Sequence, residues 1–77
     1  MQYYMITQSG RQMINQLRES DKDDEADILD FLRKNGASTS KRISGGVVVD
    51  ESKVMYMLSN MAVEGWVKRR RTKGTIL

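Results

Sequence analysis

The chain has 77 residues, of which 39% are hydrophobic, and its 13 basic and 10 acidic side chains give a net charge of +3. It contains no Cys, His or Pro, which excludes disulfides, zinc sites built from Cys and His, thiolate nucleophiles and imidazole acid–base catalysis. We therefore expect no enzyme, no catalytic residue, no cofactor and no metal, but a single small domain over residues 1–77.

The charges are unevenly distributed along the chain. Residues 1–40 carry five basic and seven acidic side chains, whereas residues 41–77 carry eight basic and three acidic ones. Such asymmetry indicates a basic face and an anionic partner. No apolar run approaches the roughly 18 residues of a membrane span, and the N-terminus has no signal-peptide pattern. We expect a cytoplasmic protein that does not bind membranes, associated with the nucleoid if it binds DNA.

In chain order, residues 3–7 are typical of a strand and residues 9–20 of a helix. Ser9 is a candidate cap for that helix, and Met13, Ile14 and Leu17 form an apolar stripe on it. Residues 19–30 then hold seven acids and one base. We interpret this stretch as a helix start that complements the helix dipole. The alternative, a divalent-cation loop, lacks the required glycine and ligand order.

Two further helices are predicted, with a short helical turn between them. The first is capped by Asp24 and ends before Gly36. A short turn capped by Ser38 or Thr39 follows, and Gly45 with Gly46 should break it. Residues 47–49 form an apolar link. The last helix, residues 50–64, starts at an aspartate and is ended by a glycine, and its buried stripe is Val54, Leu58 and Met61.

The basic run at residues 68–71 lies in a stretch that predicts a hairpin. Residues 66–71 suit a strand, residues 72–74 a tight turn, and residues 75–77 a returning strand. Alternation places Lys68 and Arg70 on one side of the strand, and Arg69 and Arg71 on the side of Val67. A disordered tail or a nuclear-localisation peptide is the alternative. The flanking Trp-Val and Gly-Thr-Ile-Leu favour the hairpin.

The segments ILDFLRKNGASTSKRIS and ESKVMYMLSNMAVEGWVKRRRTKGTIL resemble the winged helix-turn-helix family, over residues 28–77. The most specific feature is a joint spacing that involves the following residues: Val54, Leu58, Met61, Gly65, Val67 and Arg69. The resemblance implies an α+β, mostly helical fold. It would have a three-helix core and a C-terminal β-hairpin wing in residues 24–77, plus an N-terminal strand and extra helix in residues 1–20.

The N-terminal segment YYMITQSGRQMINQL is similar to the strand and helix that follow the wing in many such regulators, but here it precedes the core. Either this similarity is coincidental and the first helix packs as a simple N-terminal extension, or the segment supplies a strand and a helix to the wing of its own or a neighbouring chain. We favour the simple extension.

The resemblance implies sequence-preferring binding to double-stranded DNA in transcriptional regulation, through a recognition helix at 50–64 and a basic wing at 66–77. The candidate DNA-binding residues are Thr39, Ser40, Lys41, Arg42, Ser52, Lys53, Tyr56, Ser59, Asn60, Lys68, Arg69, Arg70, Arg71 and Lys73. The alternative is a winged-helix module that docks on another protein without binding DNA.

Specific regulation also predicts a homodimer, or cooperation with a larger partner, because one module of this size buries only about 600–1,000 Å² on DNA. The candidate dimer contacts lie on the N-terminal strand and helix: Tyr3, Tyr4, Met13 and Leu17.

Overall fold

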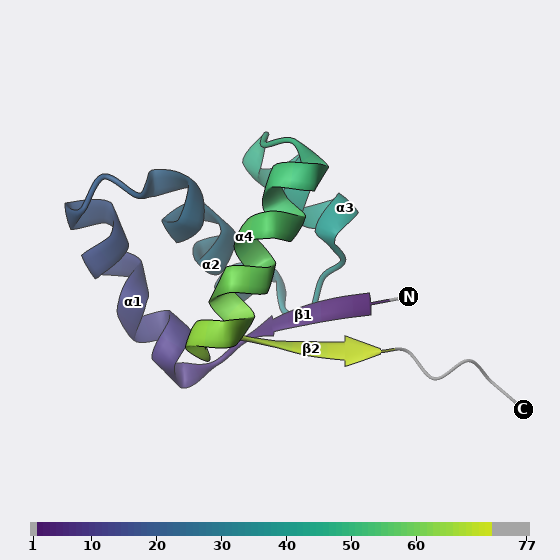
Figure 1. The fold of residues 1–77 in the computed structure, drawn as a ribbon, viewed down its shortest axis with the longest axis horizontal. Helices are drawn as coiled ribbons and strands as arrows, with labels where there is room; N and C mark the ends of the chain where they lie inside the picture. The colour runs from purple at the N-terminus through teal and green to yellow at the C-terminus, as the bar shows by residue number, and fades with distance from the viewer. Residues whose placement is uncertain (1, 72–77) are drawn as a thin grey trace, which may run out of the picture.

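A computed structural model describes residues 2–71 of the chain. The fold is α+β and mostly helical, with four helices and a two-stranded antiparallel sheet among these residues (Figure 1). The elements in chain order are β1 (Gln2–Ile6), α1 (Gln8–Glu19), α2 (Asp23–Asn35), α3 (Ser40–Val47), α4 (Glu51–Glu64) and β2 (Val67–Arg71).

The sheet joins the two ends of the described chain. β1 pairs with β2 in a register that places Gln2 opposite Arg71 and Ile6 opposite Val67. On its other side β1 meets the link between α2 and α3, where Tyr4 and Ser38 exchange two backbone hydrogen bonds of 2.9 and 3.1 Å. β1 therefore lies between Ser38 and β2. The two antiparallel strands extend to the same side of the helices (Figure 1).

This pairing corrects the favoured interpretation of the N-terminus. The N-terminal strand is no simple extension, because it supplies the partner of the basic strand within its own chain. Of the two interpretations, the structure agrees with the one in which the segment supplies a strand to its own chain. The predicted turn at 72–74 and returning strand at 75–77 lie outside the described residues, so the hairpin stays a prediction.

The core is built by one side chain cluster that includes all four helices and both strands. Tyr4 is 5% exposed and Leu17 4% exposed. These two side chains were expected in a dimer contact, but they are buried within their own chain. The reason is that α1 packs along α2, and β1 packs against α2 and α3. Met13 also packs against this core. The dimer itself stays a prediction.

Three helix boundaries follow the predictions, but α2 is not capped by Asp24: it begins at Asp23, after Lys22, without a side-chain cap. Gly36 and Gly65 end α2 and α4 with φ of +75° and +83°, where a side chain would be strained. Thr39 caps α3, its Oγ1 accepting a hydrogen bond from the Arg42 amide. α1 is capped by Thr7 rather than Ser9: the Thr7 Oγ1 accepts from the Gly10 amide and donates to the Gly65 carbonyl. Thr7 therefore ties the start of α1 to the end of α4.

The predicted break at Gly45 and Gly46 is wrong, because α3 continues through both residues to Val47. A Cβ on Gly46 would lie 2.1 Å from the Phe31 ring. Glycine is therefore needed here for the close approach of α3 to α2, and tertiary packing outweighs its low helix propensity. The helix ends instead at Val48, whose φ is +58°.

No helix within residues 2–71 is long and apolar enough to cross a membrane. The same residues contain no group of three or more acidic side chains placed to hold a metal ion.

Candidate nucleic-acid interface

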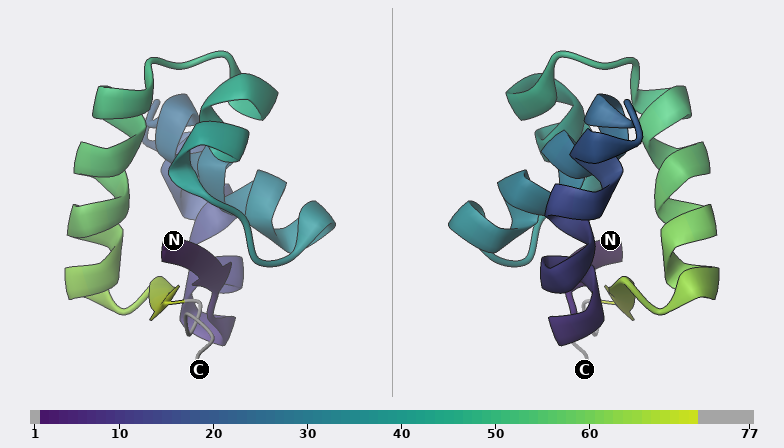
Figure 2. Two further views of the ribbon diagram at one scale, coloured as in Figure 1. Left: turned by 90° about the vertical axis from the view of Figure 1, so that its right-hand side faces the viewer. Right: turned by 90° about the vertical axis from the view of Figure 1, so that its left-hand side faces the viewer.

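Helix α4 presents one buried and one exposed face. Val54, Leu58 and Met61 are fully buried, as predicted. The outer face of α4 comprises the exposed residues Ser52, Met55, Tyr56, Ser59, Asn60 and Val63. Its apolar members are unusually open to solvent: Tyr56 is 70% exposed, Val63 83% and Met55 48%. In the two side views α4 stands at one edge of the molecule, and no other element of residues 2–71 covers its outward side (Figure 2).

Two charged residues at the start of α4 are turned toward neighbouring helices. The Lys53 ammonium lies 3.2 Å from the Asp24 carboxylate of α2. A Glu51 carboxylate oxygen accepts a 3.1 Å hydrogen bond from the Ser40 hydroxyl at the start of α3. Lys53 was a candidate for contacting DNA, yet its charge is already partly balanced by an acid in this structure.

The N-terminus of α3 lies beside the N-terminus of α4, through the Ser40–Glu51 contact. Lys41 and Arg42 in its first turn are exposed. Thr39 and Ser40 are half-buried, with hydroxyls engaged in the cap and in the contact to Glu51. The basic side chains of this turn are therefore free to reach outward, while the hydroxyls hold α3 in place.

The basic strand, residues 68–71 of β2, follows the C-terminal end of α4 after a single tight turn. All four of its side chains are exposed. Val67 is buried, so alternation places Arg69 and Arg71 on the core side of the sheet, opposite Tyr4 and Gln2. Lys68 and Arg70 lie on the other side, opposite Met5 and Tyr3. This distribution agrees with the predicted alternation.

A groove of about 360 Å³ lies between β1, the start of α3 and the start of α4. It is lined by Gln2, Tyr4, Thr39, Ser40, Lys41, Glu51 and Met55. Because Arg69 and Arg71 share a sheet face with Tyr4 and Gln2, the basic strand borders the groove that α3 and α4 form. Residues of β1, α3 and α4 that are far apart in the sequence thus line one groove.

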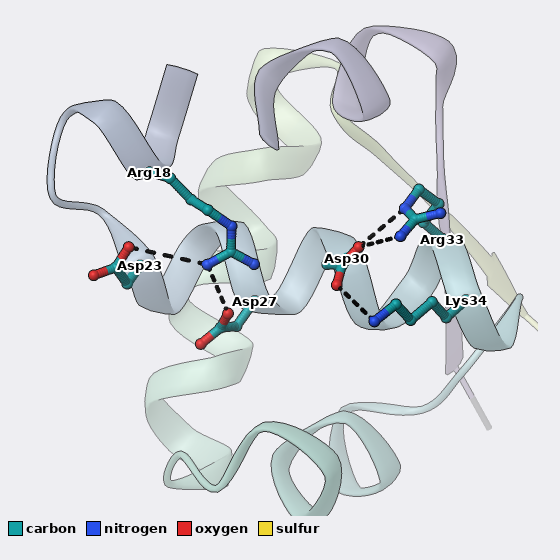
Figure 3. Close-up of polar contacts among 6 residues, drawn as sticks. All are labelled: Arg18, Asp23, Asp27, Asp30, Arg33 and Lys34. Carbon is teal, nitrogen blue, oxygen red and sulfur yellow. Dashed lines mark hydrogen bonds and ion pairs between the residues drawn. The ribbon is translucent and has the colours of Figure 1, made fainter. Parts of the chain in front are cut away.

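Three cations of α1 and α2 are engaged in ion pairs (Figure 3), whereas Arg11 and Lys22 have none within residues 2–71. Arg18 lies 3.1 Å from Asp27. Asp30 accepts hydrogen bonds from Arg33 and pairs with Lys34 at 3.3 Å. The hydrogen bond from Arg33 is the main cause that lowers the pKa of Asp30, and burial of the carboxyl opposes it.

The cations of α3 and β2 differ from these. Within residues 2–71, no carboxylate lies within ion-pair distance of a set of six cations that comprises Lys41, Arg42, Lys68, Arg69, Arg70 and Arg71. Two separate elements therefore leave uncompensated positive charge beside the groove.

The structure places the predicted residues on three adjoining elements, with two qualifications. Lys73 lies outside the described residues, and Lys53 is paired with Asp24. Met55 was not predicted as a contact residue, although it lines the groove and is half exposed. Its position three residues after Ser52 would have placed it at the edge of the exposed face.

Comparison with protein-family models, with curated proteins and with solved structures gave no match for this chain.

Proposed function

We propose that this chain binds double-stranded DNA as a small winged helix-turn-helix protein, with α4 in the major groove and the basic strand on the backbone. Transcriptional regulation is the role that sequence-preferring binding of this kind would serve. The observation that carries the proposal is the juxtaposition of the exposed face of α4 with six cations on α3 and β2 that have no ion pair within residues 2–71.

The arrangement of elements supports the winged-helix assignment. α2, α3 and α4 follow one another as three packed helices, and β2 begins directly after the Gly65 turn. Ser38, between α2 and α3, forms an antiparallel bridge with Tyr4. In a winged helix, a short strand between the first two helices would pair with the sheet at this place. β1 then occupies the place beside β2 where a wing's second strand would pair. The proposed architecture is thus a winged helix whose wing receives a strand from the N-terminus.

The charge distribution supports DNA as the partner. Phosphate contacts by Lys and Arg release counterions and supply most of the affinity of proteins for DNA. The acidic residues that pair with other cations lie on α2, away from the groove. The cations of α3 and β2 have no such partner within residues 2–71, so these two elements carry positive charge beside the neutral outer face of α4.

A salt titration tests the proposal. We expect the logarithm of the association constant for a duplex to fall linearly with the logarithm of salt concentration, by about 0.9 per phosphate contact. Arg69→Gln and Arg71→Gln should each reduce this slope by about 0.9. Arg33→Gln is the matched control, because Arg33 pairs with Asp30 on α2 and should leave the slope unchanged.

Absence of duplex binding at about 50 mM salt would contradict the proposal, as would a slope near zero. Equal slopes for the β2 and α2 variants would remove the basic strand from the interface.

A second function, docking on another protein, is favoured by the exposed apolar side chains of α4, chiefly Tyr56 and Val63. Amide chemical-shift mapping separates the two. DNA should perturb Ser52, Tyr56 and β2, whereas a module that docks only on proteins would show no shifts with duplex DNA.

A further inference from the structure

The outer face of α4 has an unusual composition for a helix that reads DNA. α4 contains no Arg, and its one Lys is Lys53, whose ammonium lies 3.2 Å from Asp24. Guanine is read most often by Arg or Lys, which bond its O6 and N7 together. Glu51, which could accept from cytosine, already accepts a hydrogen bond from Ser40. The helix therefore offers little for recognising G·C pairs.

The same face offers groups that match A·T pairs. Met55 and Tyr56 are adjacent, exposed and largely apolar. The C5-methyl group of thymine is the apolar feature that a base pair presents in the major groove. Asn60 lies one turn after Tyr56 on the exposed side, and an Asn amide can bond adenine N6 and N7 together.

The charges around this neutral face fit the profile of a major groove. Lys41 and Arg42 lie near the N-terminal end of α4, and the basic strand begins just beyond its C-terminal end. α4 has 14 residues and is thus about 21 Å long, whereas the major groove is about 12 Å wide. Cations at both ends can then reach the two phosphate backbones while the neutral face meets base edges.

We propose that Met55 and Tyr56 contact thymine methyl groups, so that the chain prefers A·T pairs at the centre of its site, with Asn60 directed to adenine. This inference rests on the proposed DNA binding. It adds that the preference depends on one chemical group, the methyl carbon at thymine C5.

Four duplexes of equal length isolate that group, and fluorescence anisotropy at one salt concentration measures their affinities. The first contains mixed A·T pairs without A-tracts, and the second replaces every thymine with uracil. The third contains G·C pairs, and the fourth the same sequence with 5-methylcytosine. The thymine duplex should bind at least about fourfold tighter than the uracil duplex, the factor expected for burial of one methyl-sized group. It should also bind tighter than the G·C duplex.

Variants show whether α4 is responsible. The double variant Met55→Ser, Tyr56→Ser should bind the thymine and uracil duplexes equally, with circular dichroism confirming that it remains folded. Both side chains are exposed, so the fold should tolerate the changes. Arg69→Gln is the matched control, because it should weaken binding to all four duplexes while leaving the ratio between thymine and uracil unchanged.

The outcomes separate the two proposals. No binding to any duplex would overturn both. Binding of all duplexes with equal affinity, or a preference for G·C, would overturn the thymine-methyl inference and leave DNA binding intact. A thymine preference that survives the double variant would overturn the assignment to Met55 and Tyr56.

Discussion

Val48 combines a left-handed backbone with a β-branched side chain. Its φ is +58°, and its amide donates to the Ser44 carbonyl to end α3. This conformation usually requires glycine, because Cβ crowds the following carbonyl at a cost of about 1–2 kcal/mol. The side chain is 88% exposed, so packing offsets little of that cost. The turn between α3 and α4 is therefore a strained point in the fold.

Val48→Gly should stabilise the protein by about 1 kcal/mol, because glycine adopts the left-handed conformation without steric strain. The midpoint of urea unfolding measures the change. Val63→Gly is the matched control, since Val63 is similarly exposed but lies in the regular helix α4. That change should cost a few tenths of a kcal/mol. A Val48→Gly variant no more stable than the parent would contradict a strained turn.

At the scale of elements, Gly10 determines how closely α1 approaches the junction between α4 and β2. A Cβ on this residue would lie 2.2 Å from the Trp66 carbonyl oxygen and 2.9 Å from the Ile6 side chain. The Trp66 carbonyl also accepts a hydrogen bond from the Thr7 amide. α1, β1 and the junction between α4 and β2 thus meet at Gly10, where there is room only for a hydrogen atom in place of a side chain. The group that a Cβ would approach most closely is the Trp66 backbone carbonyl.

Gly10→Ala should destabilise the protein by about 2 kcal/mol, within the range for overpacked sites. Gly45→Ala, inside α3 with no atom within 4 Å of the added carbon, should instead stabilise it by about 0.5–1 kcal/mol through helix propensity. Thermal unfolding followed by circular dichroism compares the two. A Gly10→Ala variant that is as stable as the parent, or more stable, would contradict the close approach of α1 to Trp66.

These glycines also indicate which elements can be predicted from sequence. Gly36 and Gly65 end helices through their own backbone conformation, a local property that the surrounding pattern reveals. Gly46 was expected to break α3, but its role depends on the Phe31 ring of another helix. The spacing of apolar residues predicted the exposed face of α4. The ion pair between Lys53 and Asp24, however, depends on how α2 and α4 pack. Tertiary contacts of this kind have no local sequence pattern.

At the scale of the whole molecule, the least predictable feature is the pairing of β1 with β2. Both segments show strand propensity, but propensity does not specify a partner across most of the chain. The pairing makes the sheet and the helices one unit, because β1 connects to both Ser38 and β2 and carries Tyr4 into the core.

We therefore expect the sheet and the helices to unfold together. Trp66, the only tryptophan in the chain, packs against the core at the start of the sheet and reports on that region. Its fluorescence and the far-ultraviolet circular dichroism of the helices should give the same urea midpoint, as in two-state unfolding. A lower midpoint for Trp66 would mean that the sheet unfolds separately from the helices.

The position of β1 and β2 in the chain has a consequence for synthesis on the ribosome. β1 is made before the helices α1 to α4, whereas its partner β2 is made after these four helices. Closure of so long a loop is slow compared with helix formation. Until β2 emerges from the exit tunnel, the segment Tyr-Tyr-Met-Ile lacks its main pairing partner and is exposed to other strands. Translation of the basic strand is thus the step that protects the N-terminal strand from aggregation.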